Sequence, residues 1–289
     1  MANKKLKAPV NIPVEKIHPF EGHPYKVLDN EEMNTLIESI QQKGVISPIV
    51  VRPLENTEDE YEIISGHRRL RASVKAGLET VPALISAVSR DEAAIMLVDS
   101  NLHREHILPS ERAFAYKLKA EALKHQGKRT DLTSEQVAPK LATEQIGVTD
   151  NVSKDTVKRY IRLTYLISEL LDLVDEGKIA LTPAVELSYL NEVEQADLIE
   201  EIRVCDATPN LSQAQRLRAI SREEGLTPEH IGEILAEEKA NQKSTIKFSV
   251  EKLKTVAPKV KESDLENFVM KACEHYYRYL QRQRNRDAR

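Results

Sequence analysis

The spacing of the apolar residues changes once along this 289-residue chain, and that change limits the folds open to it. Between residues 10 and 88, short apolar runs of the kind found in strands alternate with segments whose apolar residues have helical spacing. Beyond residue 90 the spacing is helical up to about residue 239. These patterns predict the α+β class, with a small α/β unit first and an all-α region after it.

Strands and helices are predicted to alternate within the first unit. The predicted strands span 10–17, 46–52, 61–64 and 81–88, and the predicted helices span 33–43, 67–76, 91–101 and 110–126. Either Asp29 or Asn30 can cap the first helix, and Gly44 is placed to end it. Gly77 closes the second helix in the same way.

Breaks in this pattern predict three domains. The segment Gly127–Ser134 carries charged and turn-forming residues and little apolar content, which is typical of a linker. We therefore expect an N-terminal domain over 1–126, a helical domain over 127–240 and a C-terminal dimerisation segment over 241–289. Within that last segment, Thr245–Val250 has strand character, and an apolar stripe predicts a helix over about Ser263–Arg284.

Composition narrows the classes of function. The net charge of −4 does not by itself indicate nucleic-acid binding, so local basic clusters must carry that case. The chain has 9 glycines and neither a GxxxxGK[ST] nor a GxGxxG motif, which excludes the common glycine-rich phosphate loops. Cys205 and Cys273 lie far apart, which favours a reducing cytoplasm over a disulfide framework or a zinc site. No run reaches the ~20 apolar residues of a membrane span, so a cytoplasmic protein without a membrane partner is expected.

The segment Ser65–Ala72 (SGHRRLRA) follows a predicted strand and opens a predicted helix. Backbone N–H groups at a helix N-terminus, together with nearby arginines, can bind an anion without a phosphate loop. Gly66 would let the backbone approach phosphates closely. The alternative is a solvated basic helix face.

A second motif, Asp99–Glu105 (DSNLHRE), lies at the end of a predicted helix. Asn101 and Arg104 can direct an amide and a guanidinium to one point. The alternative is that these residues only cap and brace the helix end.

A third region, residues 142–163, is typical of a helix-turn-helix. Gly147 is predicted to end a short first helix, and Ser153 to cap a second helix that buries Val157, Tyr160, Ile161 and Thr164. The connection from Gly147 to Val152 is longer than the usual three to four residues. The candidate DNA-binding residues of the second helix, with basic ones recurring every fourth position, are Ser153, Lys154, Thr156, Lys158, Arg159 and Arg162. The alternative is an amphipathic helix with an incidental basic face.

Together these motifs resemble the ParB family of plasmid and chromosome partition proteins. The segment Gly44–Arg52 (GVISPIVVR) resembles the family's first nucleotide-contacting motif, Gly66–Arg69 its G-E-R-R motif, and Ser100–Arg104 its E-N-L-x-R motif. The similarity covers roughly residues 10–240. It implies a sulfiredoxin-like N-terminal fold that binds CTP with Mg²⁺, followed by a helix-turn-helix domain.

The resemblance assigns candidate ligands by position. Its nucleotide-binding residues are Ser47, Gly66, His67, Arg68, Arg69, Ser100, Asn101 and Arg104, and its metal ligand is Asn101. Its partners are double-stranded DNA with a palindromic site, a ParA-type ATPase and a second copy of the chain.

Three positions depart from the family pattern. His67 stands where Glu is usual, Ser47 where Gln is common, and Ser100 replaces the Glu of E-N. A serine cannot supply a carboxylate to magnesium or to an attacking water. Asp99 is adjacent, but neighbouring helical residues point in different directions. The sequence therefore favours CTP binding over hydrolysis, with weak CTP hydrolase activity left open.

The first hypothesis is a site-specific partition protein, associated with the nucleoid or a plasmid, that binds a palindromic centromere-like site as a dimer and uses CTP to form a DNA clamp. The second is a ParB-like transcriptional regulator of a plasmid or mobile element without nucleotide turnover. A sulfiredoxin-type enzyme is excluded because residues 60–75 contain no cysteine. A ParB-like nuclease or kinase stays open, although no dense carboxylate cluster supports it.

Overall fold

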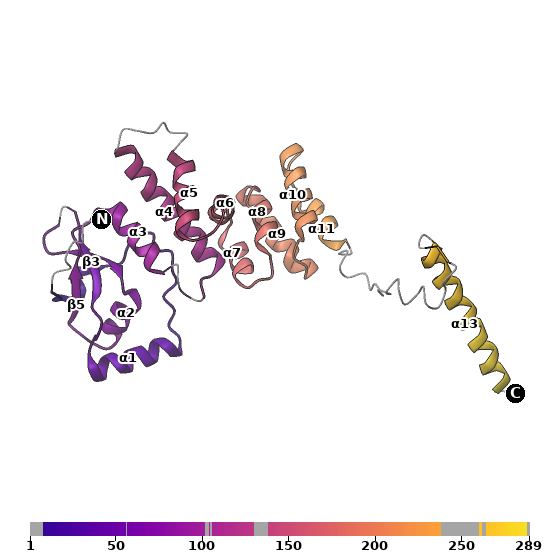
Figure 1. Ribbon diagram of the computed structural model, residues 1–289, viewed down its shortest axis with the longest axis horizontal. Helices are drawn as coiled ribbons and strands as arrows, with labels where there is room; N and C mark the ends of the chain where they lie inside the picture. Colours follow the sequence, from indigo (N-terminus) through magenta and orange to yellow (C-terminus); the bar gives the residue numbers. More distant parts are fainter. Residues whose placement is uncertain are drawn as a thin grey trace. The chain divides into compact units, whose positions relative to one another are not determined.

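The computed structural model begins with a mixed sheet of five strands, with helices interleaved between the strands (Figure 1). The rest of the first unit is helical. The structure describes residues 8–55, 57–101, 104, 106–129, 138–237, 260–261 and 264–287. Contacts group the chain into two units, Met1–Glu237 and Glu238–Arg289. The predicted α+β class, with an α/β part followed by helices, is confirmed.

The strands are short and pair in both directions. They are β1 (Val10–Pro13), β2 (Ile17–His18), β3 (Ile49–Pro53), β4 (Tyr61–Ser65) and β5 (Thr80–Ile85). Their order in the sheet is β1-β5-β3-β4-β2. The β1/β5 and β3/β4 pairs are antiparallel, whereas β3/β5 and β2/β4 are parallel.

The helices of the first unit follow the predicted pattern closely. In chain order they are α1 (Glu31–Lys43), α2 (His67–Lys75), α3 (Arg90–Asn101), α4 (Pro109–Arg129), α5 (Ala138–Thr149), α6 (Lys154–Leu163), α7 (Ser168–Asp175), α8 (Leu181–Leu187), α9 (Glu192–Cys205), α10 (Leu211–Glu223) and α11 (Pro228–Ala236). The first helix has the expected ends, because the Asn30 side chain accepts a hydrogen bond from the Met33 amide and Gly44 is the C-cap.

Both faces of the sheet are covered. The neighbouring β4 residues Ile63 and Ile64 are both buried, although successive strand side chains point to opposite faces. Ile63 packs in a cluster that includes Leu70 of α2, whereas Ile64 packs with Leu97 of α3. This double burial explains why the strands read as continuous apolar runs.

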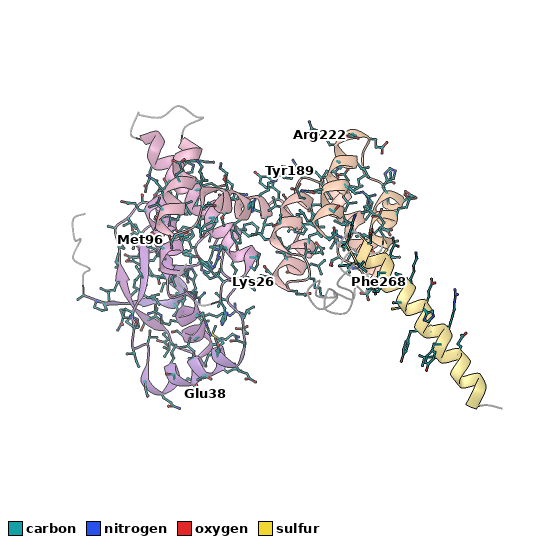
Figure 2. All side chains as sticks on the ribbon, turned by 45° about the vertical axis from the view of Figure 1, so that its right-hand side comes forward. Lys26, Glu38, Met96, Tyr189, Arg222 and Phe268 are labelled. Atoms are coloured by element: carbon teal, nitrogen blue, oxygen red, sulfur yellow. The ribbon has the colours of Figure 1, made fainter. Side chains whose placement is uncertain are left out.

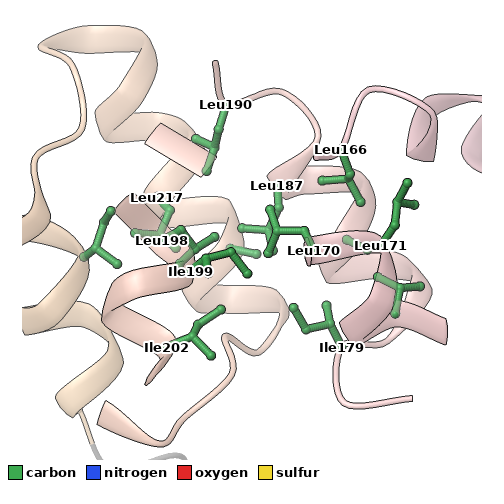
Figure 3. Close-up of a cluster of buried hydrophobic side chains, with 14 of the residues drawn as sticks. Leu166, Leu170, Leu171, Ile179, Leu187, Leu190, Leu198, Ile199, Ile202 and Leu217 are labelled. Atoms are coloured by element: carbon green, nitrogen blue, oxygen red, sulfur yellow. The ribbon is translucent and has the colours of Figure 1, made fainter. Parts of the chain in front are cut away.

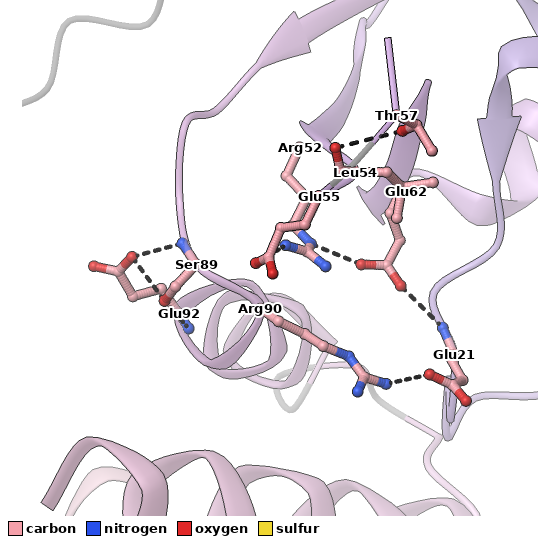
Figure 4. A network of polar contacts seen from close by, with 9 residues as sticks. All are labelled: Glu21, Arg52, Leu54, Glu55, Thr57, Glu62, Ser89, Arg90 and Glu92. Carbon is pink, nitrogen blue, oxygen red and sulfur yellow. Dashed lines mark hydrogen bonds and ion pairs between the residues drawn. The ribbon is translucent and has the colours of Figure 1, made fainter. Parts of the chain in front are cut away.

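A buried ion pair fixes the end of the β3/β4 hairpin (Figure 4). Arg52 Nε donates to Glu62 Oε2 at 2.7 Å, and both residues are 4% exposed. The second Glu62 oxygen accepts the Glu21 amide at 3.2 Å, and Arg90 pairs with the Glu21 carboxylate at 2.7 Å. Removing one partner of such a pair would leave an uncompensated charge at a cost of about 3–5 kcal/mol.

Helix α4 packs both against the α/β part that contains the sheet and against the helices that follow α4. Its Ala115 and Ala122 lie in the cluster beneath the sheet, and its Tyr116 and Ala120 lie in the cluster with α5 and α6. Ala113 joins the core of the helices that follow. The predicted boundary at 126/127 therefore falls after a helix that both parts share, and it stays a prediction.

The helices from α6 to α11 enclose the largest apolar cluster, with Leu170, Leu187, Leu198 and Leu217 near its centre (Figure 3). Two capping boxes start its longer helices. Asn191 caps α9 together with Glu194, and Asn210 caps α10 in the same manner.

The linker predicted at Gly127–Ser134 is partly wrong, because α4 continues through Gly127 to Arg129. The strand predicted at Thr245–Val250 lies outside the described residues. In the second unit, the predicted C-terminal helix is confirmed as α13 (Leu265–Asp287). No helix in the described part of the chain is long and apolar enough to cross a membrane.

Candidate functional site

A pocket of about 200 Å³ opens where β4 ends and α2 begins. It is lined by the α2 N-terminus, the segment before α1 and the end of α3: His23, Tyr25, Lys26, Val27, Ser65, Gly66, His67, Arg68, Arg69, Asn101 and Arg104. The predicted motifs at 66–69 and 101–104 thus meet at one place, although they lie more than 30 residues apart in the sequence.

The pocket is strongly cationic. Lys26, Arg68, Arg69 and Arg104 line it, and none of its described lining residues is an Asp or Glu. Arg68 is paired at its outer side with Glu32 of α1 at 3.0 Å. Because the α2 N-terminus also points backbone N–H groups at this space, the pocket fits a polyvalent anion.

Gly66 is required where it stands. Its backbone is left-handed, with φ at 101°, and a Cβ there would lie 2.9 Å from Ile49 Cγ2 and 3.0 Å from Arg69 Nη2. The missing side chain thus leaves room for the Arg69 guanidinium. Arg69 Nη1 in turn donates to the carbonyl oxygens of Ser47 at 2.5 Å and Pro48 at 2.6 Å. Arg69 therefore joins the 44–52 motif to the 66–69 motif, and burial lowers its pKa.

Two histidines stack inside the pocket. The His23 and His67 rings are 3.7 Å apart between centroids and tilted by 31°. Burial lowers the pKa of His67 to about 3, with His23 and Arg104 adding to the effect, and burial lowers the pKa of His23 to about 4. His67 Nε2 is buried without a hydrogen-bond partner among the described atoms. Both rings are thus neutral at pH 7, and His67 has one nitrogen available to a ligand.

The end of α3 contributes less than predicted. Asn101 lines the pocket, but its amide nitrogen donates to the Leu97 carbonyl at 2.8 Å and contacts Ser100 Oγ at 3.2 Å. The Ser100 hydroxyl bonds back to the same carbonyl at 2.9 Å and does not line the pocket. Ser47 does not line the pocket either; its carbonyl oxygen accepts a hydrogen bond from Arg69, which does.

Asp99 is turned away from the pocket. Its carboxylate accepts a hydrogen bond from Lys119 Nζ of α4 at 2.6 Å. Lys119 is 3% exposed and also lies 3.7 Å from Asp150. Asp99 thus helps to hold α3 against α4. It points away from the pocket because neighbouring residues on a helix point in different directions.

The sequence analysis missed His23, Tyr25 and Lys26. They lie in the irregular segment between β2 and α1, where no periodicity indicates which side chains point inward. Tyr25 is 3% exposed, and its hydroxyl donates to the Val98 carbonyl at 3.4 Å. The sequence signal for these residues is weak: a histidine, a tyrosine and a lysine lie close together in a polar connection, which is compatible with a ligand site.

The predicted helix-turn-helix is formed by α5 and α6, with a corrected turn. Gly147 does not end the first helix, because α5 continues to Thr149. Residues 150–153 form the turn, so its length is the usual three to four residues rather than longer. Asn151 supplies the left-handed residue, with φ at 54°.

The Gly147 position serves close packing. A Cβ there would lie 2.7 Å from the Val152 carbonyl oxygen, so only glycine lets the turn fold back on α5. Behind the turn, Val157 and Ile146 are fully buried with Tyr116 of α4.

The start of α6 is as predicted. Ser153 Oγ accepts the Thr156 amide at 3.0 Å and caps the helix. Lys154, Lys158 and Arg159 are exposed. Lys154 lies 3.1 Å from Glu144, and Lys158 lies 3.5 Å from Asp155.

The inward face of α6 is largely as predicted. Val157 is fully buried, and the half-buried Tyr160 and Ile161 pack against its cluster. Leu163, which was not predicted, is fully buried as well. Arg162 does not project freely as Lys154 and Lys158 do, because its Nε and Nη2 donate to Ser188 at 3.0 and 2.7 Å.

A groove of about 450 Å³ runs beside α6. Basic residues of α4 line it together with those of α6: Lys117, Lys124, Lys158 and Arg162. One carboxylate, Glu121, also lines it. Candidate phosphate contacts therefore extend from α6 to α4.

Among the described residues, no group of three or more His, Cys, Asp or Glu side chains is arranged to hold a metal ion. Cys205 and Cys273 are both free thiols.

Comparisons with known proteins agree with these motifs. The ParB N-terminal domain family matches residues 2–102. The chromosome-partitioning protein Spo0J of Thermus thermophilus is 32% identical over 209 residues, which are 72% of this chain and 70% of that protein. The chromosome-partitioning protein ParB of Myxococcus xanthus is 31% identical over 228 residues, covering 78% and 70%.

The chain belongs to the ParB family.

Among solved structures, the C-terminally truncated ParB of Caulobacter crescentus complexed with CTP-gamma-S is 26% identical. The match covers 68% of this chain and 99% of that chain, with a TM-score of 0.32. As a ParB-family chain, the protein keeps the arginines of the 66–69 motif in the pocket but presents His67 there in place of the family's glutamate.

Proposed function

We propose that this ParB-family chain is a DNA-binding partition protein whose N-terminal part holds a nucleoside triphosphate. The observation that carries the proposal is that a carboxylate-free cationic pocket and a helix-turn-helix lie in one compact unit, with α4 packed against both. A regulator that only read DNA would have no need of such a pocket.

The described residues fit the phosphates of a nucleotide. Arg68, Arg69 and Arg104 provide charge-assisted donors, the α2 N-terminus provides backbone N–H groups, and His67 Nε2 is an unpaired buried atom in the same space. The bound triphosphate would supply the negative charge that this cluster lacks. CTP is the nucleotide that the family resemblance indicates.

Magnesium fits this site poorly. Mg²⁺ is usually held by one or two carboxylates together with substrate phosphates. The described pocket offers no carboxylate, because Ser100 replaces the glutamate and Asp99 faces Lys119; its lining residues with side-chain oxygens are Tyr25, Ser65 and Asn101. Nucleotide binding without efficient turnover is therefore the expected behaviour.

DNA binding is assigned to α6 and the groove beside it. Ser153, Lys154, Thr156, Lys158 and Arg159 are the candidate contacts. Both relatives named above are chromosome-partitioning proteins. By the same resemblance we propose a palindromic site, a homodimer that closes as a clamp, a ParA-type ATPase partner and a cytoplasmic location on a nucleoid or plasmid.

The test is a calorimetric titration of the full chain with CTP, ATP, GTP and UTP, repeated with a duplex selected from a random pool by the same protein. Preferential CTP binding that changes when the selected duplex is present is the expected result. Duplex binding without binding of any nucleotide would leave the transcriptional regulator. Failure to enrich any duplex would refute DNA recognition.

A further inference from the structure

Lys26 faces two sites at once. Lys26, labelled in Figure 2, lines the cationic pocket, yet its ammonium group is paired with carboxylates of α7. Lys26 Nζ lies 3.5 Å from Asp175 Oδ2 and 3.6 Å from Asp172 Oδ1. Lys26 thereby links the pocket to α7.

The ammonium is held loosely by these carboxylates. Charge-assisted N–H···O bonds are normally ~2.7–2.9 Å long, shorter than either of these contacts. The Lys26 side chain is 48% exposed and that of Asp172 is 63% exposed, so solvent screens the attraction between them.

The surroundings of the ammonium are fixed. Asp175 is 8% exposed and accepts two hydrogen bonds from Ser110, one from the amide at 2.9 Å and one from the hydroxyl at 2.6 Å. The Lys26 amide donates to Glu111 Oε1 at 2.8 Å. The Lys26 main chain and the Asp175 carboxylate are therefore anchored to the start of α4, whereas the lysine side chain is free to turn.

We propose that Lys26 is a phosphate ligand that the nucleotide pocket shares with α7. When a triphosphate fills the pocket, the ammonium turns to it and leaves Asp172 and Asp175. This step rests on the proposed nucleotide binding and adds to it a residue outside the three family motifs.

The physical basis is competition for one charge. A lysine ammonium is a compact charge on a flexible stem, so it can change partners by side-chain rotation alone. The pocket has no described carboxylate of its own, whereas a triphosphate brings several negative charges to cations already gathered there. Such a cluster attracts the ammonium more strongly than the screened contact with Asp172 and the long 3.5 Å contact with Asp175 do together. When the ammonium leaves, the nearly buried Asp175 carboxylate still accepts both hydrogen bonds from Ser110.

Competition predicts effects of opposite sign. Removing the acid that competes should raise nucleotide affinity, and removing the lysine should lower it. An exposed pair contributes at most about 1 kcal/mol, so Asp172→Asn should tighten CTP binding by about two- to fivefold. Lys26→Ala removes a charged phosphate contact and should weaken binding by about tenfold.

The experiment is a CTP titration of the full chain in four forms: wild type, Asp172→Asn, Lys26→Ala and the double variant. Asp172 is chosen over Asp175 because Asp175 also receives the hydrogen bonds of Ser110. Glu176→Gln is the matched control, since it removes one negative charge near the same helix end from a carboxylate paired with Lys178 at 2.7 Å. Lys26→Arg, which keeps the charge, should retain most of the affinity.

The expected result is tighter binding for Asp172→Asn, no change for Glu176→Gln, and equal affinity for Lys26→Ala and the double variant. If Asp172→Asn still tightens binding in the Lys26→Ala background, the effect does not pass through Lys26 and the inference is wrong. Unchanged affinity in Lys26→Ala also overturns it while leaving the proposed function standing. Absence of CTP binding by the wild-type chain would overturn both.

Discussion

Arg162 of α6 donates two hydrogen bonds to Ser188, from Nε to the hydroxyl at 3.0 Å and from Nη2 to the carbonyl oxygen at 2.7 Å. Its guanidinium also lies over two aromatic rings, 4.4 Å from the centroid of Tyr165 and 3.9 Å from that of Tyr189. The same Tyr189 ring carries Arg218 of α10 at 3.6 Å. Arg162 therefore connects α6 to the C-terminal end of α8 and, through Tyr189, to α10.

The first prediction is that Arg162→Ala destabilises the protein. It loses two charge-assisted hydrogen bonds and two cation–π contacts, so the free energy of unfolding should fall by about 2–3 kcal/mol in urea denaturation. Lys158→Ala is the control, because that lysine is exposed and contacts Asp155 only at 3.5 Å. It should stay within about 0.5 kcal/mol of wild type while lowering the salt dependence of DNA binding by about one unit. Equal stability of the two variants would contradict a structural role for Arg162.

Helix geometry explains why Arg162 does not share the exposed face of Lys154 and Lys158, although the three residues are spaced four apart. Each step of four residues along an α-helix advances by roughly 40° beyond a full turn. From Lys154 to Arg162 there are two such steps, so the two side chains diverge by roughly 80°. A basic residue at every fourth position thus drifts around the helix, and the last one reaches the side packed against α8.

The second prediction concerns Gly147. Alanine is favoured over glycine in a helix interior by about 1 kcal/mol, so Gly147→Ala would stabilise α5 if space allowed. Instead the new Cβ would lie 2.7 Å from the Val152 carbonyl oxygen, and the turn must shift. Overpacking of this kind costs about 1–3 kcal/mol, so we expect a net loss in thermal or urea unfolding and weaker DNA binding.

Gly232 of α11 provides the matched control. A Cβ there meets only the flexible Glu201 carboxylate, at 3.1 Å from Oε2. Gly232→Ala should therefore be neutral or stabilising by up to about 1 kcal/mol. Stabilisation by both substitutions would show that the turn after α5 yields easily.

Local signals predicted much of the fold. Caps and periodicity located α1, α2, the start of α6 and α13, because the residues that decide these elements are close in sequence. The pocket was only half predicted, since His23, Tyr25 and Lys26 reach it through tertiary packing of an irregular segment. Gly147 was misjudged for a related reason: its lack of a side chain serves the approach of Val152, which no spacing rule reveals.

The third prediction separates two arginines of the pocket. Arg104 is exposed, so Arg104→Ala should weaken CTP binding by about tenfold and leave the free energy of unfolding within about 0.5 kcal/mol. Arg69→Ala should weaken binding by about tenfold to a hundredfold and also lower stability by about 1–3 kcal/mol, because the Ser47 and Pro48 carbonyls lose their donor. Calorimetry paired with urea denaturation distinguishes the two patterns. A stable Arg69→Ala protein would mean that the guanidinium does not hold the 44–52 motif in place.

The fourth prediction is a loss of stability at acidic pH that depends on His67. Burial holds the pKa of His67 at about 3 and that of His23 at about 4, both below the ordinary value of 6.5. Between about pH 4 and 6.5, the unfolded chain therefore binds protons that the folded chain does not. The free energy of unfolding should fall as pH decreases through this range, by up to about 1.4 kcal/mol per pH unit for each such proton, and these histidines should have no effect above it.

Urea midpoints at pH 7.5, 6 and 5 test this effect. His67→Gln should flatten the pH dependence, whatever its effect on stability at pH 7.5. His275→Gln on α13 serves as the exposed control and should keep the wild-type slope. If His67→Gln and wild type lose stability in parallel on acidification, another group is responsible.

The last prediction is that the C-terminal unit joins two chains. Helix α13 exposes large apolar side chains along one stripe, with Phe268, Tyr276 and Leu280 being 41%, 62% and 38% exposed. A single helix cannot bury such a stripe by itself, and pairing with a second copy about a two-fold axis would cover it and match a palindromic DNA site. Truncation after residue 239 should therefore give a monomer by light scattering, with much weaker binding to the selected duplex. Tyr276→Glu in the full chain should have the same effect, whereas Glu274→Gln on the same helix should not. A truncated chain that remains dimeric would place the interface within the first unit instead.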